Sequence, residues 1–484
     1  MLSADVLVVG GGITGAGVAR DAAMRGLQTV LIEQSDFASG TSSRSSRLLH
    51  GGLRYLAQGQ IRLVREASVE KMRLCRLAPH LCHPLQFFFP VWQGDAWALW
   101  KLALGVRIYD LLCGGRNLGR SASFSASGLA ASVPGLRQAG LKGGVAYFDA
   151  LTNDARLVID TLRSAANSGA SLHSYCRLVS ANRTGSFWAC DVHDLETNEF
   201  WQVQAAAVVN ATGAWAQGIA HSSVHLRLTK GVHLVVDRDR LPVESAVVLS
   251  EGQRILFVIP WGERLILGTT DTDYQGDPAA VRTGAEDVHY ILNVVNGAFP
   301  GARITVSDVI STWAGVRPLI APRHINADAP SSVPRRHEIR MPEPGWFDVA
   351  GGKLTTYRLM AEQVVDRIGA FLNRRLPESP TRNGPLNPGE ADSLAAAGVL
   401  PPPLEAPVVD RCCRREWTRH LNDLLLRRTS WHYYYPVQAR VGEQASHWMA
   451  RAEGWTEERR RGELAGYYAE VETSGYCQPP PSAR

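Results

Sequence analysis

The sequence predicts an α/β protein that combines a Rossmann-like domain with a mixed-sheet domain and a short C-terminal helical domain. Three observations lead to this prediction. Residues 6–33 read as strand, glycine-rich turn, helix and strand, which is the order of a dinucleotide-binding unit. Residues 230–274 hold short runs of β-branched and aromatic residues, which are typical of a second sheet. Beyond residue 375 the chain becomes rich in proline, which is typical of a linker before a further domain.

The first strand and turn carry the strongest local signal. The apolar residues 6–9 are followed by Gly10, Gly12 and Gly15 in the spacing G-x-G-x-x-G. Gly10 makes the tight turn, Gly12 lets the backbone approach a pyrophosphate, and Gly15 lets the helix pack on the strand. The next strand ends in Glu33, which can accept hydrogen bonds from both ribose hydroxyls. Strand, glycines, helix, strand and terminal acid together predict a dinucleotide site.

The acid at position 33 and a later strand narrow the choice of dinucleotide. Glu33 suits an adenosine ribose without a 2′-phosphate, which leaves NAD and FAD. Residues 205–215, AAAVVNATGAW, read as a small apolar strand followed by Thr212 and Gly213. In flavoproteins with two dinucleotide-binding domains, a strand ending in ATG returns beside the first strand and closes over the cofactor. The sequence therefore favours FAD.

Residues 40–56, GTSSRSSRLLHGGLRYL, bring hydroxyls, glycines and cations together after the second strand. A plain surface loop could have this composition, but the preceding unit places the segment near a pyrophosphate and a flavin. Gly51 and Gly52 allow the backbone to lie close to the flavin ring, and Arg54 points toward whatever stands over it. The hydroxyls expected to donate to phosphate oxygens belong to Thr41, Ser42 and Ser43.

The middle of the chain predicts a sheet with one unusual histidine. Residues 230–237, 254–261 and 264–274 predict strands of an antiparallel or mixed sheet. His233 stands among apolar residues of the first of these strands. A lone histidine in a strand is usually a core residue, so its pattern alone does not make it functional.

Two arginines and a second glycine turn follow. Arg317 lies in AGVRPL and Arg336 in PRRHEIR, and each taken singly is more often a surface charge than a ligand. Residues 346–358, WFDVAGGKLTTYR, predict a strand, a turn at Gly351 and Gly352, and a helix start. Such a turn is a second place where backbone N–H groups can meet a flavin edge.

Taken together, these motifs resemble the FAD-dependent glycerol-3-phosphate dehydrogenases of the bacterial respiratory type. The matching pieces occur in order over about residues 5–370: VVGGGITGAGVARDAAMRGL, GTSSRSSRLLHGGLRYL, APHL, FDALTNDARLV, VVNATGAW, LTKGVHLVV, FVIPW, GTTDTDYQGDP, GVRPL and GGKLTTYR. The resemblance implies a glutathione-reductase-type FAD domain, a mixed-sheet substrate domain and a C-terminal helical cap. It also implies oxidation of sn-glycerol 3-phosphate to dihydroxyacetone phosphate by hydride transfer to FAD N5, with electrons passed on to a membrane quinone.

The residue chemistry agrees with this reaction. A secondary alcohol needs a base for its hydroxyl proton, and His233 is the candidate because histidine titrates near neutral pH. A phosphate substrate calls for arginine forks. The predicted substrate-binding residues are Arg54, Tyr55, Arg317 and Arg336, and the predicted catalytic residues are His233, Lys353 and Arg317. The predicted FAD-binding residues are Gly10, Gly12, Gly15, Glu33, Thr41, Ser42, Ser43, His50, Gly51, Gly52, Thr212, Gly213, Gly352, Lys353, Leu354 and Thr355.

The resemblance also divides the chain into domains. The FAD domain is expected over about 1–80, 150–225 and 330–375, the substrate sheet over 81–149 and 226–329, a Pro-rich linker over 376–410, and a shortened cap over 411–484. Residues 414–431 resemble the late helix of the cap, whereas the helices expected before it are missing. The arginines of this region, Arg427 and Arg428 included, are expected on a solvated helix face or at an anionic membrane surface.

Composition limits the partners and the location. The hydrophobic fraction of 45% and the charged fraction of 20% are those of a globular protein of two or three domains. The net charge of +5 suits an anionic substrate but gives no nucleic-acid footprint. Eight cysteines without a CxxC pair predict free thiols in the cytosol and no metal site. The first residues enter a strand directly, so a signal peptide is not expected.

Residues 87–112 are the most membrane-like segment. Asp95, Lys101, Arg107 and Asp110 interrupt it, so it cannot cross a bilayer as one helix. A buried core helix and an interfacial contact are the two alternatives. A cytoplasmic protein that binds peripherally to the inner face of the cytoplasmic membrane, with cap contacts that support a homodimer, is therefore one expectation.

Other interpretations remain open. An oxidase of the same fold acting on an amine or amino acid needs only one carboxylate clamp, so a pocket with three arginines argues against it. A non-catalytic FAD-binding module would have no reason to keep His233, Arg54, Arg317 and Lys353 together. A plain NAD-linked dehydrogenase would hold no tightly bound yellow cofactor.

Overall fold

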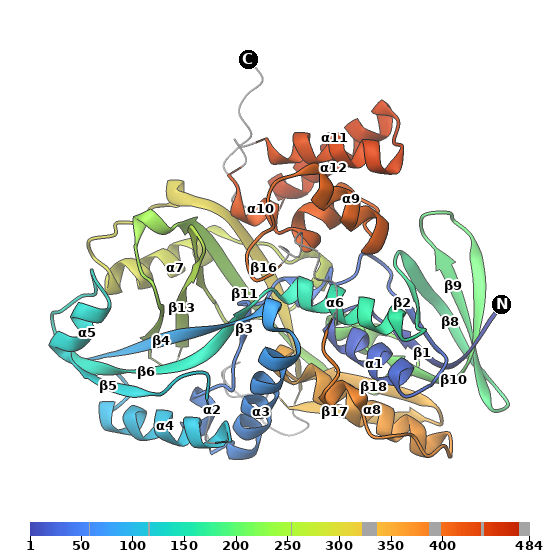
Figure 1. Cartoon of the computed structure of the whole chain (residues 1–484), viewed down its shortest axis with the longest axis horizontal. Helices are drawn as coiled ribbons and strands as arrows, with labels where there is room; N and C mark the ends of the chain where they lie inside the picture. Colours follow the sequence, from blue (N-terminus) through green and yellow to red (C-terminus); the bar gives the residue numbers. More distant parts are fainter. Residues whose placement is uncertain are drawn as a thin grey trace.

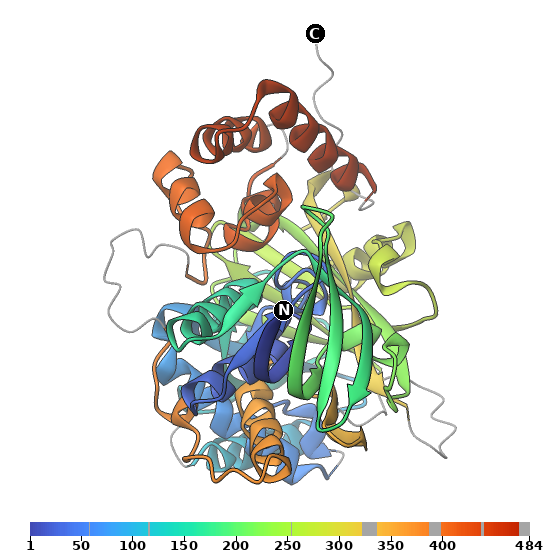
Figure 2. The same ribbon diagram turned by 90° about the vertical axis from the view of Figure 1, so that its right-hand side faces the viewer.

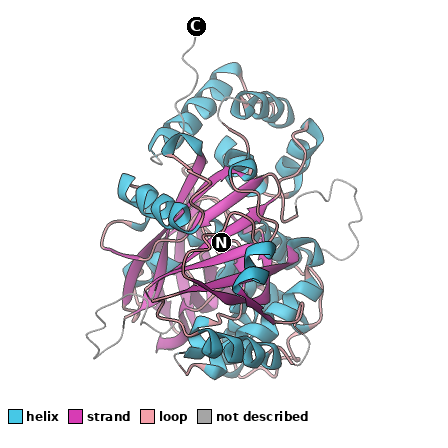
Figure 3. Ribbon diagram, turned by 90° about the vertical axis from the view of Figure 1, so that its left-hand side faces the viewer, coloured by secondary structure: helices cyan, strands magenta, loops and turns pink. Residues whose placement is uncertain are grey.

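The computed structural model of the chain describes residues 1–57, 59–114, 117–252, 254–321, 336–386, 398–436 and 440–473. Two large sheets form the body of the molecule, and a group of C-terminal helices lies above both of them in Figure 1. These helices are α9 (Ala406–Arg415), α10 (Trp431–Tyr434), α11 (Val441–Glu453) and α12 (Glu457–Thr473). In Figure 2 the same helices again stand apart from the strands, and Figure 3 shows strands passing through the middle with helices outside them.

The first sheet is built around five parallel strands. Its strands are β1 (Leu2–Val9), β2 (Thr29–Ile32), β7 (Ser171–His173), β8 (Cys176–Thr184), β9 (Phe187–Asp194), β10 (Phe200–Asn210), β17 (His337–Glu343) and β18 (Trp346–Gly351). Among the described residues the strand order is β17-β18-β10-β1-β2-β7, with the β8–β9 hairpin joined to β10. The five parallel strands are β18, β10, β1, β2 and β7, each paired in parallel with the next. The strands predicted from the glycine fingerprint and from AAAVVNATGAW are thus confirmed.

Burial on both faces explains why β1 reads as a continuous apolar run. Successive side chains of a strand point to opposite faces. Val6 and Val8 pack with the helices of one face, whereas Leu7 and Val9 pack with the β8–β9 hairpin on the other. The helices of the first face are α1 (Ile13–Met24), α6 (Asp154–Asn167) and α8 (Tyr357–Phe371). The carboxyl ends of β1, β2 and β10 are left open for a ligand.

The second sheet is mixed. Its strands are β3 (Leu48–Leu49), β4 (Cys82–Trp92), β5 (Ala122–Ser125), β6 (Leu141–Thr152), β11 (Leu226–Asp237), β12 (Ala246–Glu251), β13 (Arg254–Trp261), β14 (Arg264–Gly268), β15 (Thr272–Tyr274) and β16 (Val309–Ile320). β4 pairs antiparallel with β6 and in parallel with β12, and β11 pairs antiparallel with β14 and β16. The strands predicted over 230–237 and 254–261 are confirmed as parts of β11 and β13.

The single strand predicted over 264–274 is wrong. The chain forms β14, leaves the sheet at residues 269–271, and returns as β15 farther along β11. The interruption has a tertiary cause, because Thr270 uses its side-chain oxygen to accept a hydrogen bond from the backbone N–H of Val232 on β11 at 3.0 Å. The residues of this break face the functional site described below.

The membrane-like segment divides into a strand and a helix. The remaining helices of the body are α2 (Arg54–Ala57), α3 (Ile61–Leu77), α4 (Leu99–Leu112), α5 (Ala126–Ser132) and α7 (Ala285–Ala298). Residues 87–92 belong to β4, so the alternative of one buried core helix over 87–112 is wrong. α4 buries one side and exposes on the other the apolar side chains of Trp100, Leu104, Ile108 and Leu111. Across the described ranges, no helix is both long and apolar enough to span a membrane.

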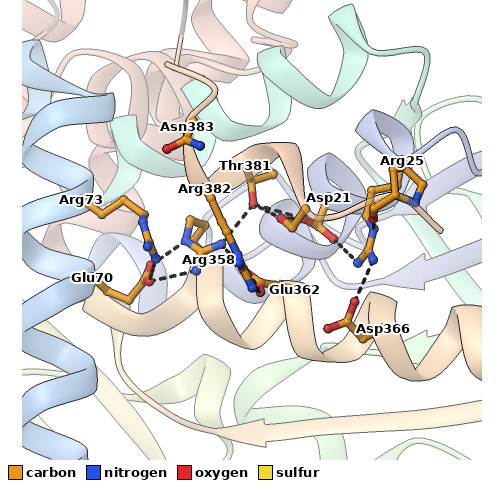
Figure 4. Close-up of polar contacts among 12 residues, drawn as sticks. Asp21, Arg25, Glu70, Arg73, Arg358, Glu362, Asp366, Thr381, Arg382 and Asn383 are labelled. Carbon is orange, nitrogen blue, oxygen red and sulfur yellow. Dashed lines mark hydrogen bonds and ion pairs between the residues drawn. The ribbon is translucent and has the colours of Figure 1, made fainter.

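Residues 376–386, the first part of the predicted linker, are bound tightly to the body. Ser379 and Thr381 donate hydrogen bonds to Asp21 of α1, and Arg382 pairs with Glu362 of α8 (Figure 4). Leu386 is buried and donates its backbone N–H to the carbonyl of Leu77. This segment therefore lies as an ordered strap across α1 and α8.

The C-terminal helices have a hydrophobic core of their own. That core contains Val409, Leu421, Leu424, Trp431, Ala445 and Met449. The continuous helix predicted over 414–431 is wrong, because α9 ends at Arg415 and a π-helical turn over Asp423–Arg428 precedes α10. The expected solvated position of Arg427 and Arg428 is also wrong. Both arginines are buried against Asp36 of the first domain, with Arg428 at 2.6 Å.

Candidate active site

A cavity of about 590 Å³ opens at the carboxyl ends of β1, β2 and β10. Its walls come from the first sheet, the loop after β2, β11, β16 and the turn after β18. The predicted cofactor residues that line it are Gly10, Gly12, Glu33, Thr41, Ser42, His50, Thr212, Gly213, Gly352, Lys353 and Leu354. Segments far apart in the sequence thus meet around one cavity.

The glycine fingerprint shapes the first end of the cavity. Gly10 has a φ of +111°, which favours glycine, and it turns the chain from β1 into α1. A Cβ on Gly15 would lie 1.9 Å from the carbonyl oxygen of Gly10, so this glycine allows the helix to pack against the turn. Gly15 does not line the cavity itself. Glu33 lines it, and its carboxylate accepts hydrogen bonds from the N–H groups of Gly11 at 2.7 Å and Ser35 at 2.9 Å.

The three predicted phosphate-binding hydroxyls have different positions. Ser42 lines the cavity, and its oxygen accepts a hydrogen bond from the N–H of Ile13 at 3.0 Å. Thr41 also lines the cavity, but its hydroxyl donates to the carbonyl of Val316 at 2.7 Å. Ser43 is buried away from the cavity. The segment therefore offers Thr41 and Ser42 to a ligand.

The two glycine turns hold each other in place. The N–H of His50 donates to Thr355 Oγ1 at 3.1 Å, and the Thr355 hydroxyl donates to the carbonyl of His50 at 3.2 Å. Gly51 is buried behind the turn, where its N–H donates to the hydroxyl of Tyr109 at 2.6 Å. Gly51 and Thr355 thus shape the cavity without lining it. Gly52 has a φ of +82° and lines a smaller cavity next to the first.

The smaller cavity has a volume of about 130 Å³ and adjoins the first. Its polar wall includes Ser46, His50, Tyr55, Asp149, Arg254, Thr269, Asp271 and Arg317. The Nζ of Lys353 lies 4.1 Å from the ring centroid of Tyr55, which is a cation–π contact between the two cavities. Ser46, His50 and Arg317 line both cavities and so mark their junction.

His233 lies on β11 and lines the larger cavity beside this junction, next to Ser46. Its ring is 1% exposed, and Nε2 lies 2.8 Å from Ser46 Oγ. The indole of Trp313 stacks on the ring with centroids 5.1 Å apart. Burial, then the positive charges of Arg317 and Arg47, hold the pKa of His233 well below its ordinary value. The imidazole is therefore neutral near pH 7, and one ring nitrogen can accept a proton.

Arg317 is fixed by the break between β14 and β15. Its guanidinium donates to Thr269 Oγ1 at 2.8 Å, to the carbonyl of Thr270 at 3.3 Å and to Asp271 at 3.3 Å. A fixed guanidinium is suited to an anionic ligand because its donors need little reorganisation. Arg317 lines both cavities, so an anion bound in either would meet it.

Arg54 and Arg336, two of the predicted substrate-binding arginines, differ in their position relative to the cavities. Arg54 begins α2 next to the smaller cavity, but its side chain lies outside the described residues. Arg336 is exposed directly before β17 and lines neither cavity, so the structure does not bring it to the site. Its backbone carbonyl lies close to Gly351, 2.5 Å from where a Cβ on that glycine would stand.

Several site residues were not singled out from the sequence. Ser46 belongs to the run of hydroxyl residues after Gly40, of which only Thr41, Ser42 and Ser43 are predicted to bind a phosphate. Thr269 and Asp271 belong to GTTDTDYQGDP, a segment that resembles the family but whose first seven residues are predicted to be part of a strand. The polarity of residues 269–271 could have indicated that the strand is interrupted. In a continuous strand these three side chains would alternate between the two faces, and a polar side chain on a buried face is unfavourable.

The cavity fits FAD in its chemistry. One end offers the N-terminus of α1 and the Glu33 carboxylate, which suit a pyrophosphate and a ribose. A Cβ on Gly12 would lie 3.1 Å from Ser42 Oγ and narrow the entry between them. The other end offers Lys353 and the turn at Gly352, which suit the ring system of a flavin.

Comparisons with known proteins agree with this site. The profile of the family described as "FAD dependent oxidoreductase" matches residues 5–367. "Glycerol-3-phosphate dehydrogenase 2" of Mycobacterium tuberculosis is 36% identical over 528 residues, covering 99% of this chain and 89% of that protein. "Aerobic glycerol-3-phosphate dehydrogenase" of Staphylococcus aureus is 38% identical over 379 residues, covering 76% of this chain and 68% of that protein.

A solved structure is similar over nearly the whole chain. It is described as the glycerol-3-phosphate dehydrogenase from Bacillus halodurans complexed with FAD. The TM-score is 0.79 at 29% identity, and the match covers 98% of this chain and 96% of that one. These similarities confirm the predicted fold class and the predicted cofactor, FAD. The chain belongs to the family of FAD-dependent glycerol-3-phosphate dehydrogenases.

Proposed function

We propose that the chain oxidises sn-glycerol 3-phosphate to dihydroxyacetone phosphate. The observation that carries this proposal is the meeting of a neutral, buried His233 with a fixed Arg317 at the junction of the two cavities. A base and an anion-binding group at one junction match an alcohol that carries a phosphate. The names of the relatives from Mycobacterium tuberculosis and Staphylococcus aureus support the same substrate.

The residues divide the chemistry between them. His233 accepts the proton of the secondary hydroxyl, directly or through the hydroxyl of Ser46 at 2.8 Å. Arg317, together with Arg54 at the start of α2, binds the phosphate. Lys353 lies at the flavin end and stabilises negative charge there. Bound FAD supplies the hydride acceptor at N5.

Anaerobic addition of candidate substrates to the FAD-loaded protein tests this proposal. We expect sn-glycerol 3-phosphate to bleach the oxidised-flavin absorbance, and glycerol without the phosphate to do so far more slowly. Bleaching by glycine or a D-amino acid, with none by glycerol 3-phosphate, would replace the proposal by an amino-acid oxidase. Bleaching by none of these compounds would favour a non-catalytic flavoprotein.

We further propose that the electrons pass to a membrane quinone and that α4 makes the peripheral membrane contact. The exposed side chains of Trp100, Leu104 and Leu111 lie on one side of this helix. Lys101 and Arg107 are exposed beside them and can meet anionic headgroups. This surface supports a protein that lies on the membrane rather than one that crosses it.

Sedimentation with vesicles of anionic phospholipid tests the membrane contact. Leu104→Glu together with Leu111→Glu should leave the protein in the supernatant, while the wild type pellets with the vesicles. Phe200→Glu is the matched control, because Phe200 is 68% exposed on β10 of the first sheet. Equal pelleting of the double variant would place the membrane contact elsewhere. Addition of a short-chain quinone to the reduced protein would report the acceptor separately.

A further inference from the structure

Arg47 is a buried arginine directly behind the proposed base. It follows the Ser- and Thr-rich residues 41–46 and directly precedes β3. The residue is 1% exposed, and its φ of +54° is one that a non-glycine residue rarely adopts. Aromatic rings surround its guanidinium: Cζ lies 4.4 Å from the ring centroid of Trp261, 5.2 Å from Trp313 and 5.6 Å from Tyr433. These rings come from β13, β16 and α10, so the body and the C-terminal helices enclose the cation together.

The charge of Arg47 is only partly compensated. The nearest carboxylate, of Asp154, lies 3.9 Å from Nε and accepts a hydrogen bond from the N–H of Ser45 at 2.9 Å. Nη2 donates to Ser430 Oγ at 3.2 Å. Among the described residues, Nε and Nη1 have no hydrogen-bond partner. Such burial and such a backbone conformation both disfavour the folded state, and a strained, buried charge of this kind is typical of functional sites.

The structure connects Arg47 to His233 by two routes. Trp313 contacts the guanidinium and also stacks on the imidazole with centroids 5.1 Å apart and planes at 21°. The residue before Arg47 is Ser46, whose hydroxyl lies 2.8 Å from His233 Nε2. The position of Arg47 is therefore coupled to the ring through stacking and through the chain.

The other charged groups around His233 pair with one another or with a ligand. Arg317 on β16 approaches from the cavity side and already pairs with Asp271 at 3.3 Å. Under the proposed function it also meets the phosphate of the substrate. Asp154 of α6 pairs with Arg47 at 3.9 Å, and the titratable group that α10 places against Arg47 is the Tyr433 phenol. Arg44, His50 and Lys353 line the same cavity as His233 and would meet a ligand there. Arg47 lines neither cavity, so it is a cation that a bound anion does not contact.

We propose that Arg47 is a positioning residue for the reaction: its enclosed charge keeps the ring of His233 neutral while an anionic substrate is bound. A neutral ring is required because an imidazolium cannot accept the hydroxyl proton. The inference rests on the proposed role of His233. It assigns to Arg47 an effect on the protonation of the base and no contact with substrate.

The test compares Arg47→Met, which removes the charge, with Arg47→Lys, which keeps it. Loss of the positive charge favours the protonated ring, so the pKa of His233 should rise. The rate of anaerobic flavin reduction by glycerol 3-phosphate should fall at acid pH, where His233 becomes protonated. The pH at which the rate falls should be higher by about one unit in Arg47→Met and should change much less in Arg47→Lys. Arg20→Met is the matched control, because Arg20 is an equally buried arginine bound to Ser164 and to backbone carbonyls.

A second measurement does not depend on activity. In FAD-loaded protein with ¹³C-labelled histidine, the ring signal that disappears in His233→Gln is followed through a pH titration without substrate. We expect this signal to titrate at higher pH in Arg47→Met than in the wild type. Asp154→Asn should shift it the other way, because it removes the carboxylate nearest to Arg47, and this variant also serves if Arg47→Met does not fold.

The outcomes separate the two proposals. If glycerol 3-phosphate reduces the flavin in neither the wild type nor any variant, the proposed function fails. The pH titration of the His233 ring signal still reports on Arg47 in that case. Identical titration of His233 in wild type, Arg47→Met and Asp154→Asn overturns the role of Arg47. An equal shift of the His233 titration in Arg20→Met would mean that the effect comes from general destabilisation, and it would also overturn the role of Arg47.

Discussion

At the residue scale, the site depends on two side chains whose environments push them toward opposite charge states. His233 is neutral because it is buried near cations, and Arg317 is fixed because Thr269 and Asp271 bind it. One accepts a proton and the other binds an anion. Removing Arg317 should weaken substrate binding, whereas removing His233 should slow the chemical step.

Arg317→Ala should weaken substrate binding and leave FAD bound. Loss of two charge-assisted hydrogen bonds costs about 3 kcal/mol, which raises the Kd for glycerol 3-phosphate roughly a hundredfold. Titration of the oxidised-flavin spectrum with substrate under anaerobic conditions measures this. Arg227→Ala is the control, because Arg227 forms a surface pair with Asp273 and lines neither cavity. An unchanged Kd in Arg317→Ala would remove the residue from the phosphate site.

His233→Ala should slow flavin reduction far more than it weakens binding. Loss of a general base typically lowers the rate by a factor of about 10² to 10⁴. Single-turnover reduction at saturating substrate separates the rate from the affinity. A variant that is reduced as fast as the wild type would move the base elsewhere, with Lys353 as the next candidate.

At this scale the sequence predicted residues that belong to compact motifs. Gly10, Gly12 and Glu33 could be assigned because one strand–turn–helix unit carries their physical roles. Ser46 and Asp271 could not, because their importance arises from contacts with His233 and Arg317 on other strands. Arg336 lines neither cavity, and its neighbours in the sequence do not indicate which way its side chain leaves the sheet edge.

At the scale of elements, buried ion pairs hold the two glycine turns at a fixed separation. α3 follows the first turn and α8 follows the second. Arg358 of α8 donates to both oxygens of Glu70 of α3, at 2.6 and 2.8 Å, and both side chains are 2% exposed (Figure 4). Arg358 also binds Glu362 on its own helix. These contacts connect the helices that follow the turns near His50 and Lys353.

Glu70→Gln should destabilise the protein markedly. The substitution leaves Arg358 buried without its main counter-charge, which typically costs about 3 kcal/mol or more. Glu66→Gln on the same helix is the control, because its partner Arg62 is 86% exposed, and such a pair contributes about 0–1 kcal/mol. Chemical denaturation followed by flavin fluorescence measures both. Equal stability of the two variants would show that the buried pair does not hold the turns.

Elements were predicted well where one physical pattern ran through the whole segment. β13 and the second half of β1 are continuous apolar runs and were found, whereas in the segment over 264–274 the apolar residues of β14 are followed by the polar residues 269–273. The break exists because Thr270 and its neighbours bind groups on β11 and β16. Such a tertiary cause is not visible in local periodicity.

At the scale of the whole molecule, the C-terminal helices are joined to the body by buried charges. Arg428 donates to both oxygens of Asp36, which lies three residues after Glu33 of the cofactor cavity. Arg156 of α6 donates to Glu416 at 3.0 Å. The sequence indicated an arginine-rich helix here but could not indicate that its partners lay almost four hundred residues earlier.

His420 provides a pH-dependent part of this attachment. It lies between Glu463 of α12 at 2.8 Å and Glu196 of the first sheet's hairpin region at 3.0 Å. The hydrogen bond to Glu463 raises the pKa of His420 to about 9. Because the folded-state pKa lies above the unfolded value of about 6.5, the stabilisation is full below about pH 6.5 and is lost as the pH rises through about 9.

His420→Gln should therefore lower Tm most at pH 6 and not at all above pH 9.5. The expected loss at pH 6 is about 1–2 kcal/mol, less than the full pKa shift would give, because the ring is partly exposed to solvent. Thermal unfolding at several pH values measures it. A constant difference between variant and wild type from pH 6 to 10 would contradict the assignment.

Under the proposed function, sn-glycerol 3-phosphate bound at the cavity junction loses hydride from C2 to bound FAD. The most direct test is anaerobic stopped-flow reduction of the FAD-loaded protein by the ordinary substrate and by the substrate deuterated at C2. We predict rapid loss of the oxidised-flavin band, and slower loss with the deuterated compound because the C2–H bond breaks in that step. A flavin that stays oxidised with both compounds would contradict the account.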